Sequence, residues 1–139
     1  MSEVTLTVKH NGIEYSGEIY RIESTALGSE DHGIMTGYLY CKGDGTGIGL
    51  GGLGLDSYNK EDKRREGTAY GLDWIKRVIE TVGVESWEKL PGARVIGLFT
   101  GSGHLGQSAV GIANVDTGKV LIWKEHAEEW RGRAGVEVQ

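Results

Sequence analysis

One segment of this chain has the apolar spacing of a long helix, and segments with the alternating pattern of β-strands lie on both sides of it. Thr68 suits an N-cap and Gly83 a C-cap. Between them the apolar residues recur at helical spacing, at Ala69, Leu72, Ile75, Val78, Ile79 and Val82. Strands, then a helix, then strands is the order typical of an antiparallel sheet packed on a helix. We therefore predict an α+β fold, a mostly antiparallel sheet packed on one central helix, as a single domain over residues 1–139.

The residues before the helix predict two hairpins. Asn11-Gly12 between two alternating runs is a strong hairpin signal, and Asp44-Gly45 supplies a second tight turn. The strands predicted in this half are 4–8, 13–19, 33–42 and 46–55. From Asp56 to Gly67 the sequence is polar and charged, which indicates an exposed loop leading into the helix.

Strand patterning returns after the helix. Ser86 begins a short turn that Pro91 stops. The strands predicted beyond it are 93–100, 108–116 and 119–124. A final short helix is expected from Glu125 to about Arg131.

Glycine is over-represented, with 24 glycines against one proline. They are interleaved with Ile, Leu, Val, Tyr and Trp, which predicts a packed core rather than disorder. Two runs, Gly49-x-Gly51-x-x-Gly54 and Gly101-x-Gly103-x-x-Gly106, match the dinucleotide-binding fingerprint. Neither lies between a strand and a helix, so we interpret them as hairpin loops and close backbone packing. A glycine loop that contacts a phosphate outside a Rossmann fold remains an alternative.

Charge and cysteine content narrow the partners and the compartment. The formal net charge is −5, and basic residues are interleaved with acidic ones, which argues against wholesale nucleic-acid binding. A small anionic ligand stays open, because two or three arginines in one cleft can hold a phosphate. The single Cys41 excludes an intramolecular disulfide and fits a reducing compartment. With no export signal and no apolar run of membrane-spanning length, we expect neither export nor a membrane span.

No catalytic constellation is recognisable. The four histidines lie in separate segments without metal-ligand spacing, so neither a metal nor a cofactor is predicted. Gly-x-Ser-x-Gly and paired His-x-Thr motifs are absent from the sequence, and Cys41 is most simply a core residue. The tryptophans predict core or interface anchors, of which one or two could instead stack on a base: Trp74, Trp87, Trp123 and Trp130. Binding is therefore favoured over catalysis.

The stretch Gly67–Gly92 and the downstream Val110-Gly111-Ile112-Ala113-Asn114 resemble the central helix, the turn after it and a strand of a family of small bacteriophage proteins. The family is the first type of phage Thoeris anti-defence protein. The resemblance runs from Gly67 to about Arg131, roughly half the chain. Ala113 stands where the family usually has glycine, and the loop Gly101–Gln107 looks longer than the family's.

The resemblance carries expectations about function. The family's members are sponges that bind cyclic ADP-ribose isomers and related cyclic nucleotides in the host cytoplasm, so the host's immune signal does not reach its effector. The resemblance implies dimers or higher oligomers such as hexamers, with ligand pockets at subunit interfaces. It also implies an aromatic residue that stacks on the base, an asparagine that hydrogen-bonds the ligand, and arginines on the phosphates. In this chain those are Phe99, Asn114, Arg77 and Arg131.

Each of these four residues also has a structural interpretation. Phe99 suits the core, Arg77 suits a surface ion pair with Asp73, and Arg131 suits a solvated charge. Asn114 suits a cap of the turn that follows it. Two other functions remain open. One is a phage protein–protein adaptor with a tryptophan-rich interface. The other is a nucleotide-degrading enzyme, whose signature would be a metal cluster or paired histidines.

Overall fold

The fold is α+β, as predicted. The computed structural model describes residues 6–43, 45–100 and 108–133 of the 139-residue chain. Its strands are β1 (Leu6–His10), β2 (Ile13–Asp31), β3 (Ile34–Lys42), β4 (Gly47–Gly54), β5 (Asp56–Asn59), β6 (Arg64–Gly67), β7 (Arg94–Phe99), β8 (Gly111–Ala113) and β9 (Val120–Ile122). Its helices are α1 (Ala69–Val82), the 3-10 turn η1 (Trp87–Lys89) and α2 (Trp123–Arg131). No helix in the described residues is long and apolar enough to cross a membrane.

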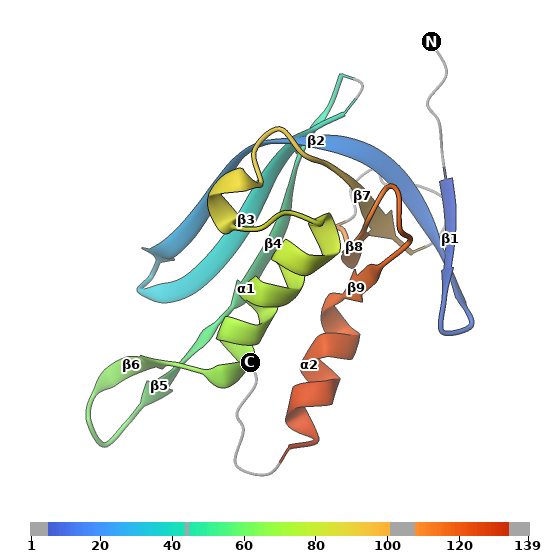
Figure 1. Cartoon of the computed structure of the whole chain (residues 1–139). Helices are drawn as coiled ribbons and strands as arrows, with labels where there is room; N and C mark the ends of the chain where they lie inside the picture. Colours follow the sequence, from blue (N-terminus) through green and yellow to red (C-terminus); the bar gives the residue numbers. More distant parts are fainter. Residues whose placement is uncertain (1–5, 44, 101–107, 134–139) are drawn as a thin grey trace.

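Seven strands form one antiparallel sheet in the order β4-β3-β2-β7-β8-β9, with β1 also paired to β2. Both α-helices lie on the same side of this sheet (Figure 1). The main core fills the space between, around Trp74 and Val78 of α1, Trp123 and Trp130 of α2, and Leu39 of β3. A smaller apolar cluster around Tyr15, Ile96 and Leu98 lies on the other side of the sheet, beside β1.

Local signals in the sequence set the turns and the helix ends as expected. Asn11 and Gly12 have φ of 50° and 78°, the left-handed pair that a tight hairpin requires. The Thr68 hydroxyl accepts a hydrogen bond from the Gly71 backbone N–H at 2.9 Å, which caps α1. Gly83 ends the helix with φ of 89°.

The central strand is longer than predicted. Strand β2 has 19 residues, whereas the alternating pattern predicted only 13–19. Its first half pairs with β1 and β7, and its second half pairs with β3. A bulge between Ile22 and Ser24 inserts an extra residue into β2. It breaks the alternation of apolar and polar residues, so the period-two pattern does not predict that the strand continues.

The prediction of an exposed loop over Asp56–Gly67 was wrong, because this segment is the β5–β6 hairpin. Polar groups rather than apolar ones stabilise it. The Asn59 side-chain oxygen accepts hydrogen bonds from the backbone N–H groups of Glu61 and Asp62 in the turn. Across the strands Arg65 donates to the Asp56 carboxylate at 2.9 Å.

Candidate functional site

An aromatic platform lies on the face of the sheet that is turned away from the helices. Along β3, Leu39 and Cys41 point into the core, so the intervening Tyr38 and Tyr40 point to the opposite face. The two rings are stacked, with centroids 5.6 Å apart and planes 6° from parallel. Among the described residues, no group is hydrogen-bonded to either tyrosine hydroxyl. We call Tyr38 and Tyr40 the tyrosine platform.

Gly52 of the neighbouring strand makes room for the Tyr38 ring. Gly49 is paired with Tyr40 and Gly51 with Tyr38 across β3 and β4. A Cβ atom at Gly52 would lie 2.6 Å from the Tyr38 hydroxyl oxygen, and φ of 87° at Gly52 also disfavours any side chain. A Cβ atom at Gly51 would overlap the Gly37 carbonyl oxygen, so this glycine of the first run serves close backbone packing, as predicted, although the run lies within β4 and not in a hairpin loop. The second run, 101–106, and the loop 101–107 lie outside the described residues.

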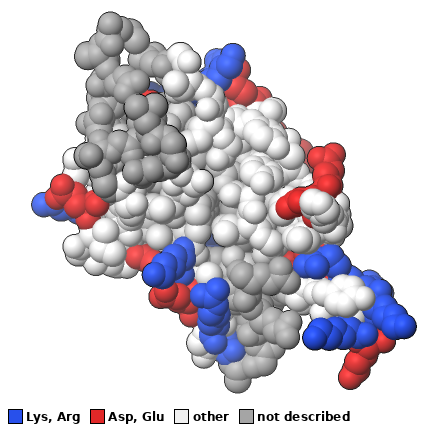
Figure 2. Space-filling view, turned by 180° about the vertical axis from the view of Figure 1, so that it is seen from behind, with Lys and Arg blue, Asp and Glu red and all other residues white. Residues whose placement is uncertain are grey.

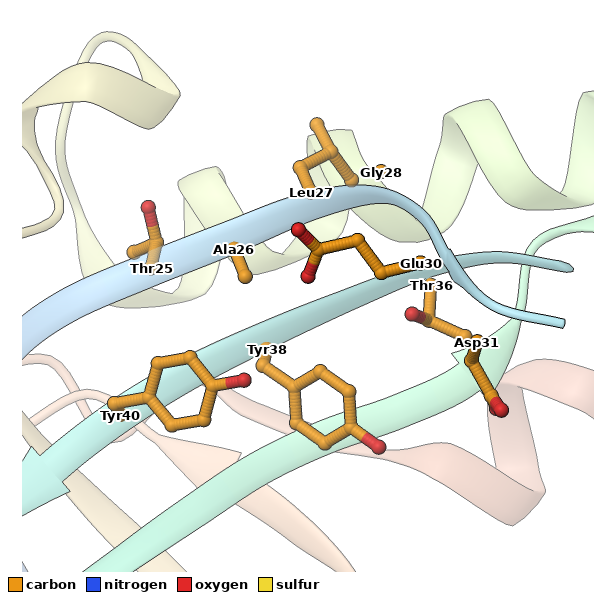
Figure 3. A pocket seen from close by; sticks show the side chains of 9 residues that line it. All are labelled: Thr25, Ala26, Leu27, Gly28, Glu30, Asp31, Thr36, Tyr38 and Tyr40. Atoms are coloured by element: carbon orange, nitrogen blue, oxygen red, sulfur yellow. The ribbon is translucent and has the colours of Figure 1, made fainter. Parts of the chain in front are cut away.

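Two adjoining hollows flank the platform and share Tyr40. The larger, about 520 Å³, is lined by Thr25, Ala26, Leu27, Gly28, Glu30, Asp31, Thr36, Tyr38 and Tyr40. Figure 3 shows the two rings on one side of this hollow, the Glu30 side chain reaching back beside Leu27 toward Tyr38, and Asp31 at the end of β2. The smaller hollow, about 420 Å³, continues past Tyr40 to Lys42 and Glu23. Seen from this side, the middle of the molecule is uncharged and the charged side chains gather toward its rim (Figure 2).

Phe99 and Asn114, two of the four residues implied by the resemblance, are built into the fold. Phe99 is only 1% exposed and belongs to the main core. The Asn114 amide nitrogen donates to the carbonyl oxygens of Thr81 and Val82, both at 3.0 Å, at the end of α1. Its side-chain oxygen accepts from the backbone N–H groups of Asp116 and Thr117. Asn114 therefore caps the turn, as its structural interpretation requires, and also ties that turn to the helix.

The two arginines lie on the helices, and neither lines either hollow. Arg77 on α1 is 3.9 Å from the Asp73 carboxylate and 3.6 Å from that of Glu129 on α2. Arg131 is exposed at the end of α2. Burial raises the pKa of Tyr70, and the positive charge of Arg131 partly offsets that rise. The four residues therefore belong to the core, a turn and two helix surfaces, away from the tyrosine platform.

Replacing Asn114 with alanine is expected to lower the free energy of unfolding by about 2 kcal/mol, because four backbone groups lose their partner. Thermal unfolding measures the loss. Ligand affinity at the tyrosine platform should stay within about twofold of wild type. A well-folded variant that had lost binding would return Asn114 to the ligand site.

A partly buried polar cluster lies between α1 and α2. The Asp73 carboxylate accepts hydrogen bonds from His126 Nε2 at 2.8 Å and from Trp130 Nε1 at 3.1 Å through the same oxygen. Burial alone would raise the pKa of Asp73, but these two hydrogen bonds and the nearby charges of His126 and Arg77 outweigh it and hold that pKa below its ordinary value. The cluster joins the two helices and opens into neither hollow.

The sequence contains one signal for the platform, the alternation of residues along β3. Tyr38 and Tyr40 alternate with Leu39 and Cys41, so one face of β3 was bound to carry both tyrosines. Which face would be covered by helices depends on pairings between distant strands.

The chain matches no family model, no curated protein and no solved structure. Within the part of the chain that the structure describes, no three or more His, Cys, Asp or Glu side chains are placed to hold a metal ion.

Proposed function

We propose that this protein is a phage anti-defence sponge, which binds a cyclic nucleotide immune signal in the host cytoplasm and releases it unchanged. The observation that carries the proposal is the tyrosine platform beside an open hollow of about 520 Å³. Every nucleobase has a π face, and stacking on an aromatic side chain contributes about 1–3 kcal/mol per base. Two parallel rings on a rigid sheet give a base a surface that needs no reordering before it binds.

The resemblance of Gly67–Gly92 and Val110–Asn114 to the Thoeris anti-defence family supports the choice of ligand class. The platform differs from the residues that this resemblance implies, since the base would stack on Tyr38 and Tyr40 rather than on the buried Phe99. The platform leaves one face of a bound base uncovered. A second copy of the chain would cover it, in keeping with the oligomers that the resemblance implies.

The decisive experiment asks what happens to the ligand. Purified protein is incubated with cyclic ADP-ribose or with 3′,3′-cyclic GMP–AMP, and the free ligand is measured before and after heat denaturation. We expect the free ligand to be depleted before heating and recovered intact after it. Recovery of a cleaved product would overturn the proposal in favour of an enzyme. No depletion of either ligand would overturn it in favour of a protein–protein adaptor.

Removing the platform is expected to weaken binding. Tyr40 is 44% exposed, so Tyr40→Leu should fold normally while losing the stacking surface. We expect affinity to fall about tenfold for Tyr40→Leu and further for Tyr38→Leu/Tyr40→Leu, measured by titration calorimetry. The matched control is Tyr58→Leu, because Tyr58 is 50% exposed on the β5–β6 hairpin and lines neither hollow. Equal losses in the control and in the platform variants would remove the platform from the site.

A further inference from the structure

Three basic side chains stand in a row across three neighbouring strands. Arg21 of β2 is paired with Lys42 of β3 on one side and with Arg94 of β7 on the other. Residues paired directly across antiparallel strands point to the same face of the sheet. All three residues are exposed. We call Arg21, Lys42 and Arg94 the cation row.

The cation row lies on the same face as the tyrosine platform. Lys42 follows Tyr38 and Tyr40 at two-residue steps along β3, and successive residues of that kind are about 7 Å apart on one face. The smaller hollow links the platform to one member of the row, because Tyr40 and Lys42 both line it. The positive charge of Lys42 therefore lies next to Tyr40 on the same face of β3.

The fold itself gains little from this arrangement. Like charges placed directly opposite each other on a sheet are destabilising. Arg21 is partly neutralised by Glu23, whose carboxylate lies 2.7 Å from Nη2 of Arg21. Neither Lys42 nor Arg94 is ion-paired within the described part of the chain. The row keeps an excess of positive charge at this place although the whole chain has a formal net charge of −5.

The opposite end of the platform has the opposite charge. Glu30 and Asp31 line the larger hollow, Asp31 at the end of β2 and Glu30 with its carboxylate turned back beside Leu27 toward Tyr38 (Figure 3). A ligand along β3 would thus meet the carboxylates of the larger hollow beside Tyr38, and beyond Tyr40 three cations with the single carboxylate of Glu23. An anionic group is favoured at the end with Lys42, where three cations outnumber Glu23, and is repelled by the two carboxylates of the larger hollow.

We infer that the cation row binds the phosphates of a nucleotide whose base stacks on the tyrosine platform. This inference rests on the proposed function and adds the direction in which the ligand lies. The phosphates contact Lys42, Arg21 and Arg94, while the base lies on Tyr40 and Tyr38. Arginine and lysine side chains both serve as phosphate ligands, arginine through two parallel hydrogen bonds.

The test removes the charges and keeps the platform. The variant Arg21→Gln/Lys42→Gln/Arg94→Gln is titrated with cyclic ADP-ribose, whose two phosphates are its only anionic groups, at low and at high salt. We expect the affinity of the variant at low salt to be at least about tenfold lower than that of wild type. We also expect high salt to weaken binding less in the variant than in wild type. The matched control, Arg64→Gln/Lys89→Gln/Lys124→Gln, removes the same charge from exposed positions that line neither hollow. It should change affinity by no more than about twofold.

A second variant predicts a change of opposite sign. Glu23 is the carboxylate that neutralises Arg21, so Glu23→Gln frees that guanidinium for the ligand. Glu23→Gln is expected to raise the affinity for cyclic ADP-ribose by about threefold at low salt. A purely structural role of the Arg21–Glu23 pair predicts no gain in affinity.

The outcomes separate this inference from the proposed function. If Tyr38→Leu/Tyr40→Leu weakens binding while the cation-row variant and its control bind alike, the sponge stands and the cation row is not its phosphate site. Weakened binding in both the platform and cation-row variants, with tighter binding in Glu23→Gln, supports a ligand with its base on the platform and its phosphates on the cation row. If wild type binds neither cyclic ADP-ribose nor 3′,3′-cyclic GMP–AMP, both proposals are overturned.

Discussion

Replacing Gly71 with alanine is expected to lower the free energy of unfolding by about 3 kcal/mol, although alanine is the better helix former. Gly71 lies in the first turn of α1, where that turn packs on Leu55 between β4 and β5. A Cβ atom at Gly71 would overlap the Leu55 carbonyl oxygen and lie 2.8 Å from its carbon. The obstacle is backbone, so no change of rotamer relieves it. The helix has to move away from the strand connection.

The expected loss of stability in Gly71→Ala is the balance of a gain in helix propensity and a loss of packing. Glycine to alanine within a helix gains about 1 kcal/mol of intrinsic propensity. Movement of α1 would in turn break the 2.7 Å hydrogen bond that the Thr68 hydroxyl donates to the Leu55 carbonyl. It would also loosen the packing around Trp74, which is fully buried. These losses exceed the gain in propensity.

Chemical denaturation of Gly71→Ala and of the control Gly67→Ala measures this difference. A Cβ at Gly67 would meet nothing within 4 Å, and no positive φ applies there. The control should stay within about 0.5 kcal/mol of wild type. A Gly71→Ala variant as stable as wild type would mean that α1 does not pack on Leu55 as described.

Local patterns predicted those parts of the fold that depend on neighbouring residues. Asn11-Gly12, Thr68 and Gly83 each act within a few positions of themselves, and all three have the predicted role. Strand pairing between distant segments is predicted less well from the sequence. The second half of β2 pairs with β3 beyond a bulge. The bulge interrupts the alternation of apolar and polar residues, so the sequence pattern does not predict this half of the strand.

The polar hairpin β5–β6 shows a different limit. Its stability comes from side-chain hydrogen bonds such as those of Asn59 and Arg65, which hydrophobic periodicity does not detect. The candidate site depends on both kinds of information. The alternation that places Tyr38 and Tyr40 on one face is visible in the sequence. The row of Arg21, Lys42 and Arg94 exists only through the register of three strands that are far apart in the chain.

Replacing Asp73 with alanine is expected to lower the free energy of unfolding by about 3 kcal/mol at neutral pH. One Asp73 oxygen accepts from both His126 and Trp130, and the His126 side chain is fully buried. Without the carboxylate, two buried N–H groups have no acceptor, and each carries a desolvation cost of about 1–3 kcal/mol. Glu80→Ala is the matched control, since Glu80 is an exposed carboxylate on the same helix. Its effect should stay within about 0.5 kcal/mol.

The contribution of Asp73 should also depend on pH with a definite sign. The folded protein holds the pKa of Asp73 below its ordinary value of 3.8, so the unfolded chain takes up a proton at this group more readily than the folded one. Its stabilising contribution is therefore complete above that ordinary value and is lost as the pH falls through the lower folded pKa. We expect the stability difference between wild type and Asp73→Ala, measured by denaturation from neutral to acid pH, to narrow as the solution becomes acidic. A difference that widened toward acid pH would show that the carboxylate is not held ionised by His126, Trp130 and Arg77.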